Sequence, residues 1–66
     1  MEYMYYTNKV GDSCRVYNVR TNGLFWRGYD YSVEVNNKYD LRFKSINHLS
    51  LWLEEEGYNF MGHDND

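Results

Sequence analysis

The sequence contains no proline, a single cysteine and no apolar run approaching the ~20 residues that a helix needs to cross a bilayer. The lone Cys14 excludes a framework of intrachain disulfides and a cysteine-rich zinc site. The first residues also lack the charged segment followed by an apolar segment that marks a secretory signal. We therefore expect a cytoplasmic protein that does not associate with membranes.

The chain is short in aliphatic residues and rich in aromatic ones. Its 66 residues suffice for one domain, and only 14 of them are Leu, Ile, Val or Phe. Eight tyrosines, three phenylalanines and two tryptophans compensate, because each aromatic ring buries about 150–250 Å² when it packs. We expect a thin core in which the ring bodies lie inside and the tyrosine hydroxyls lie at the rim.

Charge is distributed unevenly along the chain, whose formal net charge is −3. All seven Lys and Arg residues lie between Lys9 and Lys44, whereas residues 45–66 carry five acidic residues and neither Lys nor Arg. This asymmetry is consistent with two alternatives: association between oppositely charged regions of two copies, or a solvated acidic tail.

The clearest local pattern lies in residues 29–44. Apolar and polar residues alternate over 29–35 and again over 39–44, and Asn36-Asn37-Lys38 separates the two runs. A period of two residues on both sides of an Asn-rich turn predicts an antiparallel hairpin with one buried face. Asn is suited to this turn because it tolerates the left-handed backbone conformation.

A helix is predicted for residues 45–56. Ser45 is a suitable N-cap, and Gly57 is placed to end the helix in a left-handed conformation. The apolar residues at helical spacing form one face. They are Ile46, Leu49, Trp52 and Leu53.

The first part of the chain predicts further strands. Residues 3–7 and 14–20 are rich in aromatic and β-branched residues, and the Asn22-Gly23 pair is typical of a hairpin turn. Residues 24–27 are then predicted to form a strand. Together with the alternating run at 29–35 they form one long predicted strand over 24–35, with a kink at Gly28.

Together these elements predict an α+β fold: a curled antiparallel sheet of four to five strands, in the order β-β-β-β-α, packed by one C-terminal helix. Residues 58–61 form a short final strand or a packed tail. The domain then covers residues 1–61, and 62–66 form a flexible acidic tail. The predicted core consists of Tyr31, Val33, Val35, Tyr39, Leu41, Phe43, Ile46, Leu49, Trp52 and Leu53.

The residues able to do chemistry form no recognisable motif. Cys14, His48 and His63 do not stand in any local pattern that links a nucleophile to a base. The segment 63–66 offers metal-ligand types, but without zinc or EF-hand spacing. We therefore predict that the protein is not an enzyme and holds no metal or cofactor.

Three features predict a protein partner. Leu51 lies opposite the apolar face of the helix, and acidic residues occupy the last helical turn, where the helix dipole favours cations. In addition, the first two strands have aromatic or apolar residues on both faces, and a single helix can cover only one. The candidate partner surface comprises Leu51, His48, Glu54, Glu55, Tyr5 and Tyr17.

These features predict a small protein-interaction module, self-associating as a homodimer or binding another protein as an inhibitor or adaptor. The alternative is single-stranded nucleic-acid binding, in which bases stack on strand aromatics beside arginines. The net negative charge opposes this alternative. Its candidate residues are Arg15, Tyr17, Arg20, Phe25, Trp26 and Arg27.

The small size, the absence of proline and the abundance of Tyr and Asn resemble the general style of many small phage and mobile-element proteins. This resemblance assigns no role to any residue.

Overall fold

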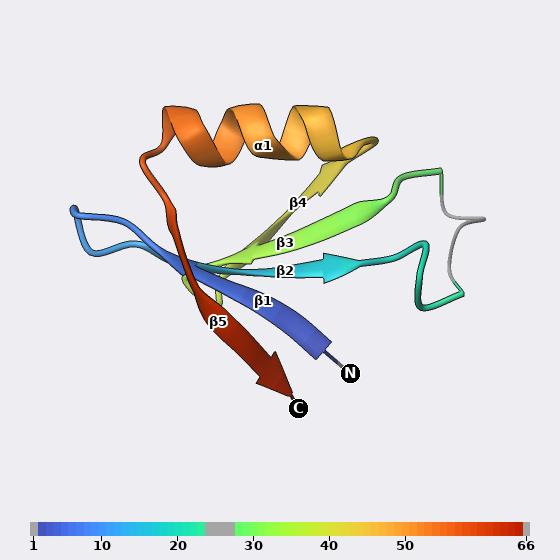
Figure 1. Ribbon diagram of the computed structural model, residues 1–66, viewed down its shortest axis with the longest axis horizontal. Coiled ribbons are helices and arrows are strands. Elements are labelled where there is room, and N and C mark those ends of the chain that lie inside the picture. Colours follow the sequence, from blue (N-terminus) through green and yellow to red (C-terminus); the bar gives the residue numbers. More distant parts are fainter. Residues whose placement is uncertain (1, 24–27, 66) are drawn as a thin grey trace.

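The computed structural model describes residues 2–23 and 28–65. Its elements are β1 (Glu2–Thr7), β2 (Ser13–Asn18), β3 (Tyr31–Val35), β4 (Tyr39–Phe43), α1 (Ile46–Glu55) and β5 (Asn59–Asn65). The five strands form one antiparallel sheet in the order β4-β3-β2-β1-β5, and α1 lies on one side of it (Figure 1). The predicted α+β fold, an antiparallel sheet with one helix, is confirmed.

Local chemistry accounts for the hairpin and for the ends of the helix. Asn36 and Asn37 adopt left-handed backbone angles, with φ of 52° and 59°, in the turn between β3 and β4. The Ser45 hydroxyl caps the helix by accepting a hydrogen bond of 3.4 Å from the backbone N–H of His48. Gly57, with φ of 71°, takes the left-handed conformation that ends the helix. Each of these features follows the sequence prediction.

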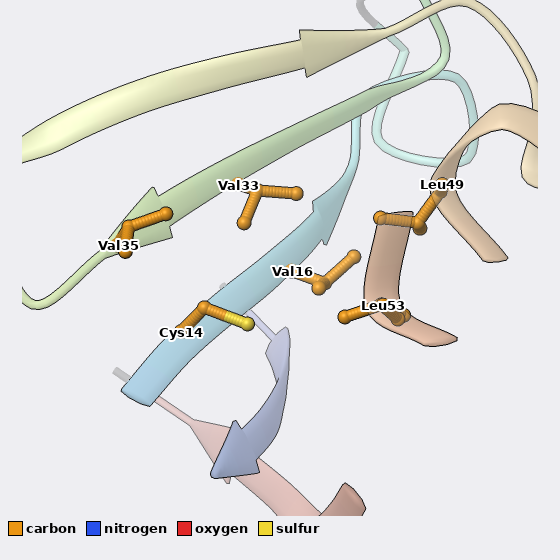
Figure 2. Close-up of a cluster of buried hydrophobic side chains, with 6 residues drawn as sticks. All are labelled: Cys14, Val16, Val33, Val35, Leu49 and Leu53. Carbon is orange, nitrogen blue, oxygen red and sulfur yellow. The ribbon is translucent and has the colours of Figure 1, made fainter. Parts of the chain in front are cut away.

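The core lies between the sheet and α1. Strand register places Val16 between Met4 and Val33, so that one face of the sheet is continuously apolar. Figure 2 shows Leu49 and Leu53 directed from the helix toward this face. The fully buried cluster consists of Cys14, Val16, Val33, Val35, Leu49 and Leu53. Aromatic residues pack around this aliphatic centre and are only half-buried. They include Tyr6, Tyr31, Phe43, Trp52 and Tyr58.

The predicted core is correct in its centre and wrong at one end. Ile46 is 51% exposed, because α1 begins directly after β4 and its first residue lies at the edge of the sheet. Cys14 and Val16 are buried although the core prediction omits them, because they belong to β2, the middle strand of the sheet. Val19, directly after β2, is also buried and was also omitted. The side chain of Tyr39 lies outside what the structure describes.

Two segments differ from the expected strands. Residues 28–30 precede β3 and are not part of it, and Gly28 has φ of 85°; the predicted strand at 24–27 lies outside the described residues. At the other end, β5 continues to Asn65, through residues expected to form a flexible tail. Its pairing with β1 passes from Phe60 to Gly62, so that Met61 is the extra residue of a β-bulge.

Candidate interaction surfaces

The face of the sheet turned away from α1 carries a cluster of tyrosines around one arginine. Because side chains alternate along a strand, Tyr3 and Tyr5 of β1 share this face with Arg15 and Tyr17 of β2. The rings of Tyr3 and Tyr17 are 5.6 Å apart at their centroids, tilted by 43°. The Arg15 guanidinium carbon lies 4.5 Å from the centroid of the Tyr3 ring, within the range of a cation–π contact.

Arg15 is fixed from a second side by Glu34 of β3, the residue directly opposite it. One Glu34 carboxylate oxygen accepts hydrogen bonds from Arg15 Nη2 at 2.7 Å and from Arg15 Nε at 3.2 Å. The side chains of Arg15 and Glu34 remain 23% and 36% exposed. We call the set Tyr3, Tyr5, Arg15, Tyr17 and Glu34 the tyrosine face. It is a pre-organised surface that solvent can still reach.

The charges on this side of the sheet are balanced. Register places Asp40 opposite Glu34, and Arg42 opposite Ser32. The open-face positions of β1 to β4 therefore carry two arginines and two acidic residues. A surface with both signs in equal number suits a protein partner with its own mixed charges, whereas phosphate binding needs an excess of cations.

The predicted partner residues of the helix lie on the other side of the molecule. Leu51 is 59% exposed, and His48, Glu54 and Glu55 are exposed as well. They lie outside the buried side of α1, which contributes Leu49 and Leu53. His48, Leu51 and Glu55 also border a groove beside β4. The six candidate partner residues therefore form two surfaces: Tyr5 and Tyr17 on the open face of the sheet, and the other four on the outer side of α1.

The candidate nucleic-acid residues are only partly brought together. Arg15 and Tyr17 are neighbours within the tyrosine face. Arg20 follows β2, is exposed, and has its Nη1 atom 3.9 Å from a carboxylate oxygen of Asp30. The remaining three candidates, Phe25, Trp26 and Arg27, lie outside the described residues.

The residues considered for catalysis occupy separate environments. Cys14 is buried in the core, and burial raises the pKa of its thiol to about 12. His48 Nδ1 lies 3.0 Å from the Ser45 hydroxyl on the helix, and His63 Nδ1 lies 3.2 Å from a Glu2 carboxylate oxygen at the β1–β5 edge. Within residues 2–23 and 28–65, no three His, Cys, Asp or Glu side chains are grouped to hold a metal ion.

Sequence reasoning missed Tyr3 and Glu34 as members of the tyrosine face. The two-residue spacing of Tyr3 and Tyr5 was a signal that they share a face, but only strand register shows which residues of β2 and β3 lie beside them. It also missed Phe60 and Met61, which are 53% and 60% exposed on β5. The sequence predicted a short final strand or a packed tail at 58–61, but only the order of the strands shows that this segment is an exposed edge.

Comparison of the chain with known protein families, with curated proteins and with solved structures finds no match. Separately, none of the helices formed by the described residues has the length and apolar character needed to span a membrane.

Proposed function

We propose that this protein is a small, non-catalytic protein-interaction module of the cytoplasm that associates with a second copy of itself through the tyrosine face. The observation that carries the proposal is the one-sided cover of the sheet: α1 packs on one face, and Tyr3, Arg15 and Tyr17 are held in fixed contact on the other. Tyrosine and arginine are enriched in protein interfaces because each combines a large contact surface with hydrogen-bonding groups.

Charge favours a second copy as the partner. Arg15 and Glu34 lie in adjacent strands near the middle of the open face, with Asp40 and Arg42 beside them on β4. Two such faces related by a two-fold axis can place arginines against acidic residues in both directions. An inhibitor or adaptor could use the same face for another protein.

Sedimentation equilibrium over the micromolar to submillimolar range tests this proposal. We expect a monomer–dimer equilibrium that Tyr5→Ser combined with Tyr17→Ser shifts to monomer, because the two rings supply the apolar contact area. Ser50→Asp, at an exposed position of α1, is the matched control and should leave this equilibrium unchanged. A wild-type chain that stays monomeric throughout, or a double variant that dimerises like wild type, contradicts the proposal.

Single-stranded nucleic-acid binding is the second candidate, because the stacked Tyr3, Tyr17 and Arg15 have the chemistry that single-strand binders use. Titration of tyrosine and tryptophan fluorescence with oligothymidine at low salt separates the two functions. Quenching that weakens with added salt and disappears in Arg15→Gln favours nucleic acid. Unchanged fluorescence favours the protein partner, as does the sequence pI near 5.2.

A further inference from the structure

The two edges of the sheet differ in shape and in charge. Beside β4, the edge strand and α1 enclose a groove of about 460 Å³. Its apolar wall is formed by Phe43, Leu51 and Trp52, and Arg42 and Lys44 stand beside it. We call this the edge groove. Its other two lining residues, both on α1, are His48 and Glu55.

The opposite edge, β5, has complementary properties. Phe60 and Met61 are more than half exposed there, although the bulk of β5 is a regular strand paired with β1. The segment 59–66 contains two acidic residues and neither Lys nor Arg. Among the described residues, β5 pairs on one side only, so its other side presents unpaired backbone N–H and C=O groups.

We propose that β5 of one copy adds to the β4 edge of the next copy and that Phe60 enters the edge groove. Phe60 stacks edge-on against Tyr6, with centroids 5.5 Å apart, and Tyr6 belongs to the face of the sheet that packs against α1. Suppose that β5 joins a neighbouring sheet so that the α1-covered faces of the two sheets lie on the same side. Phe60 then lies on the side of the sheet that carries the neighbour's α1. That is the side on which Phe43, Leu51 and Trp52 form the apolar wall.

Strand direction fixes the geometry of this contact. All neighbouring strands of the five-stranded sheet are antiparallel, so the two edge strands, β4 and β5, run in the same direction. If two copies form one continuous sheet with their α1-covered faces on the same side, β5 of one copy is therefore parallel to β4 of the other. The contact joins two different surfaces, so each copy keeps one free edge and the assembly can grow with concentration.

Charge selects this pairing over a symmetric one. Two β5 strands placed edge to edge would bring two acidic segments together. At the edge groove, where Arg42 and Lys44 outnumber the single acidic residue Glu55, the same segment meets an excess of positive charge. One contact of this kind covers Leu51 and Phe60, two of the large exposed apolar side chains. It uses the edges and the outer side of α1, and so it is independent of the tyrosine face.

Disulfide trapping in the full-length chain tests the proposal. In a Cys14→Ala background, one variant carries Asn59→Cys at the start of β5 and a second carries Asp40→Cys near the start of β4. Equal amounts are mixed and mildly oxidised, and the disulfide-linked dimers are identified by mass. Circular dichroism checks that each variant is folded. We expect mixed dimers well above the proportion given by random pairing.

Two further substitutions make the test specific. Leu51→Asp in the Asp40→Cys partner should reduce mixed dimers to the random proportion, whereas Ser50→Asp, one residue away and outside the groove, should not. Tyr17→Ser should leave the mixed dimers unchanged even if it abolishes the contact proposed for the tyrosine face. Three results would each overturn the edge contact. The parent pair could give mixed dimers only in the random proportion, dimers linking two Asn59→Cys chains could be in excess, or Tyr17→Ser could abolish the mixed dimers.

Discussion

The face of the sheet under α1 and the open face are formed by alternate residues of the same strands, yet only the covered face has an aliphatic centre, and the open face carries the ion pair of Arg15 and Glu34. Under the helix, Val16 and Val33 are aliphatic and at most 1% exposed. On the open face, Arg15 is held between the Tyr3 ring and the Glu34 carboxylate, and all three remain partly in contact with solvent. The comparison separates the face that builds the core from the face on which we propose that a partner binds.

The covered face provides stability, because each Å² of apolar surface removed from water contributes about 25 cal/mol. The open face gains less from burial, but its side chains are already ordered by rings and ion pairs. Binding of a partner there costs less conformational entropy than binding to a surface whose own side chains are mobile, because these side chains need little further ordering. Stability and binding can therefore be altered separately, and the following substitutions test that separation.

Leu49→Ala should have the largest effect on the covered face. Leu49 is 1% exposed, so its truncation should lower the free energy of unfolding by about 2–5 kcal/mol, through lost burial and the cavity left behind. Leu51→Ala, two residues away and 59% exposed, should change it by no more than about 0.5 kcal/mol. Urea denaturation measures both values. Similar losses would mean that the phase of the helix is wrong.

Cys14 provides a pH-dependent test of the same face. Burial raises its pKa from 9.0 to about 12, so above pH 9 the unfolded chain loses a proton that the folded chain retains. The free energy of unfolding should therefore fall between pH 9 and pH 12, with Cys14 contributing at most ~1.4 kcal/mol per pH unit. Below pH 9 the thiol is protonated in both states and contributes no slope.

The matched variant for this titration is Cys14→Ala, which removes the thiol. Burial, and to a smaller extent the charge of Cys14, also raise the pKa of Tyr6. The contribution from burial has the same sign and remains in the variant, whereas the contribution from Cys14 is lost with the thiol. The variant should therefore show a shallower decline in the free energy of unfolding than wild type. Identical slopes would show that the thiol at position 14 is not protected from solvent.

The smallest effect is expected on the open face. In a double-mutant cycle of Arg15→Gln and Glu34→Gln, the coupling free energy should be about 0.2–1 kcal/mol, because both side chains are partly exposed. The coupling, measured by urea denaturation, should shrink as salt is added. A coupling that is much larger, or insensitive to salt, would indicate that this pair supports the fold in the manner of the covered face.

Local sequence patterns predicted the elements whose determinants are local. Alternation over 29–44, the left-handed Asn36 and Asn37, the Ser45 cap and Gly57 all act within a few residues of the structure they specify. These signals suffice for the β3–β4 hairpin, for α1 and for the overall antiparallel sheet with one helix.

Features that depend on distant residues were not predictable in the same way. The contact of Arg15 with Tyr3 requires the register between β1 and β2, and the exposure of Ile46 requires knowing that β4 is an edge. Residues 62–65 carry the composition of a solvated tail, and only their pairing with β1 makes them a strand. In each case the deciding partner is far away in sequence, and no local propensity encodes it.

The pairing of β1 with β5 has a consequence for the nascent chain. Residues 2–7 are synthesised before β2, which can pair with one side of them soon afterwards. The other side of β1 has no partner until residues 59–65 have been made, so an aromatic strand keeps an open side while the intervening segment is synthesised. During that interval β1 is exposed to mispairing, and completion of β5 removes this risk.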